Sequence, residues 1–175
     1  MKSIIFTLFF LLSQLFKPKA IKMNQLNLPS YEAKIVTRNG KTMIFDPLRR
    51  KYVALTPEEW VRQHFVHYLT DSLGYPGSML ANEVELTIGQ KRLRCDSVLY
   101  GLTAEPLMII EYKAPTIPLT QKVFDQISVY NMLLHVDYLV VSNGLLHYCC
   151  KMDYEHQKYL FLKEIPRYEN IRQNN

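Results

Sequence analysis

The sequence predicts an α/β domain of the α+β type, with a mixed central sheet flanked by helices. Three observations predict this class: a helix with a strong start signal, three consecutive strand-like segments joined by short turns, and a second amphipathic helix followed by an apolar strand. The resulting order is helix, three strands, helix, strand (αβββαβ), with extra hairpins at both ends. In chain order the six segments span residues 56–73, 79–88, 91–100, 107–114, 120–135 and 137–142.

Residues 1–22 differ in character from the rest of the chain. Lys2 followed by the apolar run 4–12 is typical of a secretory leader, but no small-residue cleavage site follows, and the run is short for a membrane span. Two interpretations fit this extension: a targeting segment, or an upstream in-frame extension of a protein that starts at Met23. The chain has a net charge of +5, and residues 1–22 hold four lysines and no acidic residue, which leaves +1 for residues 23–175. The basic pI is therefore no argument for DNA binding.

Residues 23–55 are predicted to be strands that belong to one domain with residues 56–175. Segments 31–38 and 41–46 flank Asn39-Gly40, a strong hairpin signal. Residues 51–55 add a further short strand, and residues 145–152 and 158–165 predict a hairpin at the C-terminal end.

The first helix begins at a capping-box pattern. Thr56 is the expected N-cap, Pro57 occupies the first helical position, and Glu59 stands where a glutamate can reach back to the cap. Gly74 is the expected end of this helix. A buried face is predicted from apolar residues at helical spacing: Trp60, Val61, Phe65, Tyr68 and Leu69.

Three ionisable residues stand on the second and third core strands. Asp96 lies in segment 91–100, and Glu111 and Lys113 end segment 107–114. If the loop at 101–106 is symmetric, facing positions add up to 207, so residue 101 pairs with 106 and Asp96 faces Glu111. Facing side chains on one side of such a pair lie roughly 5 Å apart, and two carboxylates that close need a proton or a cation between them. Lys113 shares the face of Glu111 because side chains alternate along a strand.

This trio suits phosphodiester hydrolysis. Mg²⁺ prefers hard oxygen ligands and is typically held by one or two carboxylates, with water and phosphate in its other positions. The sequence therefore predicts that Asp96 and Glu111 bind Mg²⁺, with Mn²⁺ as a substitute, and that Lys113 acts on the water or the phosphate. The simpler alternative is a solvated strand end, but residues 107–110 are apolar on both faces, and ionisable groups at the end of a buried strand need a reason.

The pattern Asp96…Glu111-Tyr112-Lys113 resembles the PD-(D/E)XK nuclease motif. Over about residues 30–165 the chain resembles more narrowly the N-terminal nuclease domain of type I restriction enzyme R proteins, through 57–63, Gln126-x-x-x-Tyr130 and 138–144. The resemblance implies a restriction-endonuclease-like fold and places Gln126 and Tyr130 in support of the site. It also implies that an acidic residue of the first helix, here Glu59, can approach the metal. Cys95 stands where the motif often has proline.

Other basic residues are candidates for contacts with nucleic acid. Lys122 lies one helical turn before Gln126 and is expected to reach the DNA backbone. Arg92 and Arg94 flank the strand of Asp96 and can contact phosphate or form a solvated strand edge.

The remaining features of the sequence narrow the range of possible functions. The cysteines show no C-x-x-C spacing, which argues against a zinc site or disulfides and favours the cytoplasm. No nucleotide-binding glycine loop or other small-molecule cofactor motif appears, and 175 residues cannot hold the ATP-driven motor of a full-length R protein. The expected function is a metal-dependent DNA endonuclease domain that can require motor or specificity subunits. The alternatives are a catalytically silent DNA-binding or assembly module of the same fold, and an envelope protein if the leader is real.

Overall fold

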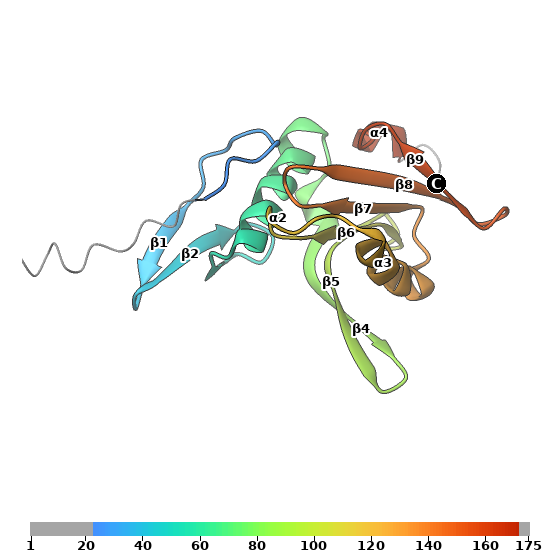
Figure 1. The fold of residues 1–175 in the computed structure, drawn as a ribbon, viewed down its shortest axis with the longest axis horizontal. Helices are drawn as coiled ribbons and strands as arrows, with labels where there is room; N and C mark the ends of the chain where they lie inside the picture. The colour runs from blue at the N-terminus through green and yellow to red at the C-terminus, as the bar shows by residue number, and fades with distance from the viewer. Residues whose placement is uncertain (1–22, 172–175) are drawn as a thin grey trace, which may run out of the picture.

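The computed structural model describes residues 23–171, which form two β-sheets and the helices packed on them (Figure 1). The predicted leader, residues 1–22, lies outside the described residues. Within residues 23–171, no helix is long and apolar enough to cross a membrane.

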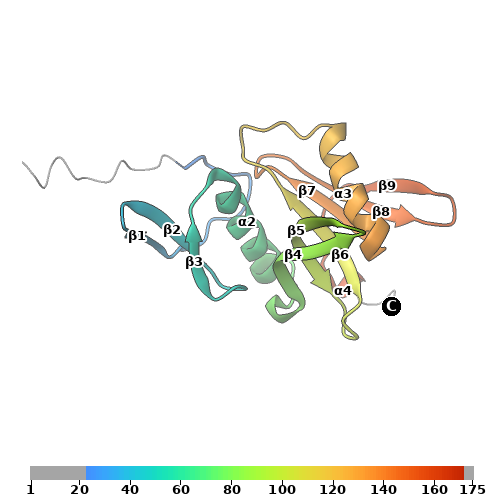
Figure 2. The same ribbon diagram turned by 90° about the horizontal axis from the view of Figure 1, so that it is seen from below.

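The smaller sheet contains three antiparallel strands in the order β1 (Ile35–Arg38), β2 (Lys41–Asp46) and β3 (Lys51–Ala54). Asn39 and Gly40 form the first turn with φ angles of 50° and 72°. Two positive φ angles are what a tight two-residue hairpin turn requires, and asparagine and glycine tolerate them best. The predicted N-terminal hairpin is therefore confirmed, and Figures 1 and 2 show it beside helix α2.

The larger sheet has six strands in sequence order. Neighbouring strands are antiparallel except β6 and β7, which are parallel and are connected through helix α3. The predicted C-terminal hairpin forms, but β8 also pairs with β7, so the hairpin extends the central sheet. The strands are β4 (Leu80–Ile88), β5 (Lys91–Tyr100), β6 (Pro106–Tyr112), β7 (Tyr138–Ser142), β8 (His147–Asp153) and β9 (Lys158–Leu162).

Helices cover both faces of this sheet (Figure 2). Helix α2 (Pro57–His67) continues into a π-helical turn, Tyr68–Ser72, and packs on one face, while α3 (Gln121–Leu134) packs on the other. The sequence did not indicate the short helix α4 (Tyr168–Ile171), because four residues are too few to show a helical period.

Alternation along the strands divides the core into two layers. Leu99, Met108 and Ile110 pack against α2, whereas their neighbours Val98 and Ile109 pack against α3. The strands β6 and β7 are buried on both faces, as their continuous apolar sequences predict.

The register of β5 and β6 is the predicted one over most of its length. The pairs Ser97–Ile110, Val98–Ile109 and Leu99–Met108 all add up to 207. The prediction is wrong at both ends: Tyr100 pairs with Pro106 at the loop, and the expected pair Asp96–Glu111 lies beyond the last pair of the ladder. The reason at the loop is local: the Gly101 N–H donates to the carbonyl of Glu105 at 2.7 Å, and Ala104 has a φ of 65°, so the loop closes asymmetrically.

Candidate active site

Strand β5 changes direction at Asp96. In its pairing with β4, Asn82–Ser97 is followed by Val84–Cys95. Glu83 and Asp96 between them are therefore unpaired, although the pairs on either side keep the same register. Glu83 has a φ of 60°, which is unfavourable for a non-glycine residue and is found mainly where the surroundings enforce it. Cys95 and Val98 both pack in the layer of α3, which strict alternation does not allow. Asp96 therefore lies at a distortion of the sheet.

The Asp96 carboxylate reaches across to β6 and to α2. Its Oδ2 accepts the Tyr112 N–H at 2.8 Å, directly beyond Glu111, and its Oδ1 accepts from Arg62 Nη2 at 2.6 Å. The side chain is 14% exposed, so both contacts form in a partly dry environment. The strand pair expected between Asp96 and Glu111 is not part of the β5–β6 ladder, which ends at Ser97–Ile110. The Asp96 carboxylate instead accepts the backbone N–H of the residue after Glu111.

Glu111 is the most deeply placed of the predicted site residues. It is 3% exposed, and its Oε1 accepts from Lys113 Nζ at 2.6 Å and from Gln126 Nε2 at 2.7 Å. Its other oxygen, Oε2, is buried and has no hydrogen-bond partner among the described residues. A buried carboxylate oxygen without a partner is costly, and a ligand would satisfy it.

The electrostatics of the site follow from this burial. Burial raises the pKa of Glu111 to about 7, and the negative charge of Asp96 adds to the effect. Burial alone would lower the pKa of Lys113, but its hydrogen bond to Glu111 and the charge of Asp96 raise it. Lys113 is therefore charged near neutral pH, whereas the ionisation of Glu111 depends on the charges of its neighbours Asp96 and Lys113.

Gln126 and Tyr130 join the site from α3. Gln126 Nε2 also lies 3.0 Å from the Tyr130 hydroxyl, and its Oε1 accepts from Lys113 Nζ at 3.2 Å. The Tyr130 ring packs in the core layer of α3, so only its hydroxyl takes part. The pair therefore forms the polar edge that the family resemblance implies, with the Tyr130 hydroxyl accepting from Gln126. Lys122 is exposed in the first turn of α3, one turn before Gln126.

The two adjacent glutamates of α2 have different surroundings. The Thr56 hydroxyl caps the Glu59 N–H at 3.0 Å, as predicted, but the Glu59 carboxylate does not return to the cap. It accepts instead from Arg49 at 2.7 Å, Arg62 at 2.6 Å and Gln63 at 2.7 Å. Within the described part of the chain, Glu59 is thus connected to Asp96 through Arg62.

Glu58 is the acidic residue of α2 whose pKa responds to the charges of Asp96 and Lys113. Burial and then the charge of Asp96 raise its pKa, whereas Lys113 lowers it. Glu58 was not predicted as a site residue, because the capping pattern at the helix start points to Glu59. The signal available was the doubled acid at the helix start, whose two side chains must point in different directions.

Arg62 is a second residue that sequence reasoning missed. It is 4% exposed and binds Glu59, Asp96 and Glu83, the last at 2.9 Å from Nη1. Three carboxylates from α2, β4 and β5 therefore share one buried guanidinium, whose planar fork suits such contacts. Glu83 also binds Arg94 at 2.6 Å, so Arg94 is not simply a solvated edge residue.

The residues present fit a hard divalent cation of the kind predicted. No group of three or more His, Cys, Asp or Glu side chains in residues 23–171 is arranged to hold a metal ion. Mg²⁺ does not need such a group, since one or two carboxylates with water and phosphate suffice. Asp96 and Glu111 supply two carboxylates whose charges interact, and Glu111 Oε2 is a potential metal ligand without a hydrogen-bond partner among the described residues.

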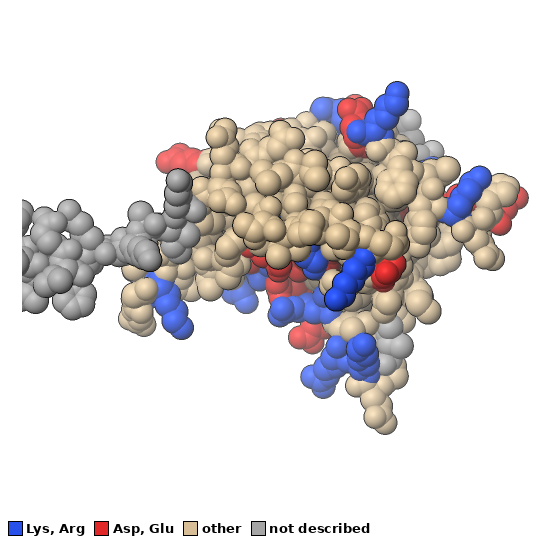
Figure 3. All heavy atoms as spheres, viewed as in Figure 1, with Lys and Arg blue, Asp and Glu red and all other residues tan. Residues whose placement is uncertain are grey.

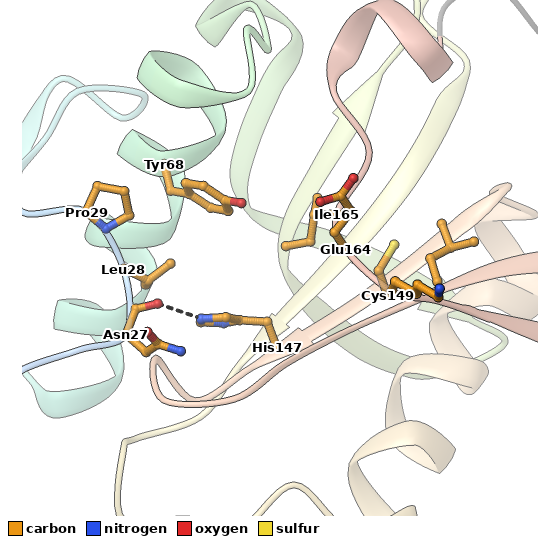
Figure 4. Close-up of a pocket in the computed structure, with 10 residues that line it drawn as sticks. Asn27, Leu28, Pro29, Tyr68, His147, Cys149, Glu164 and Ile165 are labelled. Atoms are coloured by element: carbon orange, nitrogen blue, oxygen red, sulfur yellow. Dashed lines mark hydrogen bonds between the residues drawn. The ribbon is translucent and has the colours of Figure 1, made fainter.

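A separate hollow of about 260 Å³ lies elsewhere, between residues 27–29, the π-helical turn and the segment after β9 (Figure 4). His147 lines it and bonds through Nε2 to the Asn27 carbonyl at 3.0 Å, which ties the N-terminal segment to β8. None of Asp96, Glu111 and Lys113 lines this hollow, so it is distinct from the candidate active site.

The six-stranded mixed sheet, covered by α2 on one face and α3 on the other, defines a restriction-endonuclease-like fold. Residues 57–166 match the model of the family described as the type I restriction enzyme R protein N terminus. This chain belongs to that family, and the resemblance expected from its motifs is confirmed.

Among solved structures, the chain is similar to a fragment assigned to the HsdR subunit of a type I restriction enzyme from Vibrio vulnificus YJ016. The TM-score is 0.50 at 16% sequence identity, and the match covers 68% of this chain and 25% of the other. This chain therefore spans a quarter of that relative. No curated protein matches the sequence.

Proposed function

We propose that this protein is a metal-dependent DNA endonuclease domain that hydrolyses phosphodiester bonds in a restriction-modification system. The observation that carries the proposal is the buried Glu111 carboxylate, which has one oxygen on Lys113 and Gln126 and the other without a partner. Family membership supports nuclease kinship. A buried carboxyl with a raised pKa, held against a charged lysine, is the kind of group that marks a functional site.

Asp96 and Glu111 would hold Mg²⁺ or Mn²⁺. When bound, such a cation acidifies or orients water and offsets negative charge on the phosphate. The ion would also lower the pKa of Glu111, because a positive charge favours the ionised carboxylate.

Lys113 would act on the substrate side of the site. Its ammonium is held by Glu111 and Gln126, so two of its three N–H donors have acceptors and one is left to contact a phosphate oxygen or the attacking water. Gln126, itself hydrogen-bonded to Tyr130, would hold the side chains of Lys113 and Glu111 in position. Glu58 would add negative charge at the metal side, through direct contact or through a bound water.

The test is cleavage of supercoiled plasmid by the full chain with Mg²⁺ or Mn²⁺, against EDTA. Asp96→Ala and Lys113→Ala are each expected to abolish nicking, with the far-ultraviolet circular dichroism of the wild type. Undiminished cleavage by either variant contradicts the assigned roles.

A second candidate function is a catalytically silent module that binds DNA or assembles with partners. The ion pair between Asp96 and Arg62 favours it, since that contact already neutralises the aspartate. Titration with Mg²⁺ separates the two: the nuclease gains stability from the ion, whereas a silent module does not.

The restriction context also suggests partners and a setting. Motor and specificity subunits are the proposed partners, and their addition should raise cleavage if the domain needs delivery to its target. We place the activity in the cytoplasm, where the buried free thiols of Cys95, Cys149 and Cys150 stay reduced.

A further inference from the structure

Strands β4 and β5 continue beyond the central sheet as a two-stranded ribbon. The pairing of β5 with β6 ends at Ser97–Ile110, whereas its pairing with β4 runs on from Val84–Cys95 to Ile88–Lys91. Figure 1 shows this ribbon projecting from the body of the molecule. At about 3.4 Å per residue, its five pairs give the ribbon a length of roughly 15 Å.

The two faces of the ribbon differ in chemistry. Leu86 and Leu93 are partly buried and pack against the core layer of α3. The opposite face carries Glu85, Thr87, Arg92 and Arg94, all exposed. Lys91 is exposed at the tip, and Figure 3 shows basic side chains gathered on this projection. Of the exposed ribbon residues, three are basic and Glu85 alone is acidic.

The basic face leads directly to the candidate active site. Asp96, Arg94 and Arg92 alternate along one strand, so Arg92 lies roughly 13 Å from Asp96. A chain of contacts connects Arg94 to Asp96: Arg94 binds Glu83 at 2.6 Å, Glu83 binds Arg62 at 2.9 Å, and Arg62 binds Asp96 at 2.6 Å. The ribbon is therefore an extension of the strand that carries the catalytic aspartate.

We propose that the β4–β5 ribbon is an arm that binds the backbone of duplex DNA and holds it beside Asp96 and Glu111. This inference rests on the proposed nuclease function and identifies the surface that receives the substrate. Lysine and arginine on an exposed face are the groups that contact phosphate. The major groove of B-form DNA, about 12 Å wide, admits a two-stranded ribbon, whereas that of duplex RNA is too narrow for side chains to enter.

The experiment compares two charge reversals of equal size in the full chain. Lys91→Glu with Arg92→Glu changes the arm, and neither residue has a role in the proposed chemistry. Lys158→Glu with Lys163→Glu makes the same change in net charge at exposed positions on and beyond β9, away from the arm (Figure 1). Binding to a duplex DNA of about three helical turns is measured by fluorescence anisotropy in EDTA, from about 50 to 200 mM salt.

The arm variant is expected to bind at least about tenfold more weakly, with a salt dependence shallower by about two, because two phosphate contacts are lost. The control variant should stay within about twofold of the wild type. Equal losses in both variants, or no loss in the arm variant, overturn the proposal. Duplex RNA of the same sequence should bind more weakly than DNA, and RNA binding that is as tight and equally sensitive to the arm overturns the DNA assignment.

The measurements distinguish a failure of the proposal that the arm binds DNA from a failure of the proposal that the protein is a nuclease. Binding in EDTA does not depend on cleavage, so loss of binding in the arm variant supports the arm even if no metal activates the protein. Where the wild type does cleave, the arm variant should lose plasmid cleavage but retain hydrolysis of a small aryl phosphodiester. Plasmid cleavage that is unchanged in the arm variant overturns the arm and leaves the nuclease intact.

Discussion

Glu111→Gln should stabilise the protein at high pH. Burial next to Asp96 raises the pKa of Glu111 from 4.5 to about 7, which means that the folded protein pays to ionise this group. At 1.36 kcal/mol for each tenfold change in the ionisation equilibrium, the difference corresponds to about 3 kcal/mol. Glutamine keeps an oxygen that can accept from Lys113 and Gln126 but carries no charge, so this penalty disappears.

The effect has a defined pH window. Between pH 4.5 and about 7 the unfolded chain releases the Glu111 proton while the folded chain keeps it, so wild-type stability falls as the pH rises through this range. Below pH 4.5 both states are protonated and the variant has no advantage. Above pH 7 the variant should be more stable by up to about 3 kcal/mol, or roughly 6 to 12 °C in Tm for a chain of this size.

The measurement is urea unfolding at a series of pH values from 4 to 8.5 in EDTA. Glu85→Gln removes an exposed carboxylate on β4 and serves as the matched control, for which no pH-dependent gain is expected. A Glu111→Gln variant that is less stable than the wild type at pH 8, or equally shifted at pH 4 and pH 8, refutes the reasoning. Adding Mg²⁺ at 100 times its Kd should return about 2.7 kcal/mol to the wild type at pH 8 and much less to the variant.

Two further predictions concern the charge network beside the site. Arg62→Met should destabilise the fold by about 3 to 5 kcal/mol, because it leaves the carboxylates of Glu59, Glu83 and Asp96 short of a buried partner. Arg62→Lys should recover only part of this in the same urea titration, and a variant as stable as the wild type would count against the network. Glu83→Gly should be more stable than Glu83→Ala by about 1 kcal/mol, since both remove the carboxylate but only glycine tolerates the φ of 60°. Equal thermal stability of the two would show that the backbone at residue 83 relaxes freely.

The local features of the fold followed from local sequence. The Asn39-Gly40 turn, the capping of α2 by Thr56, and the register of β5 against β6 were all predictable, because turn chemistry and alternation act over a few residues. Pairing of Gln126 with Tyr130 followed from their separation of one helical turn. The positions of Glu111 and Lys113 next to each other required only that one strand alternate.

The sequence alone thus determined the order of elements and put the acidic residues on two neighbouring strands, with the lysine directly after one of them. Tertiary structure decided that the charges of the site act on Glu58, whereas Glu59 binds Arg49, because this depends on how α2 is rotated against the sheet. It also decided that Arg62 and Glu83 form the link between Asp96 and Arg94, since these contacts join α2 to β4 and β5. Hydrophobic periodicity shows which face of an element is buried, but the partners of a buried charge depend on the packing between elements.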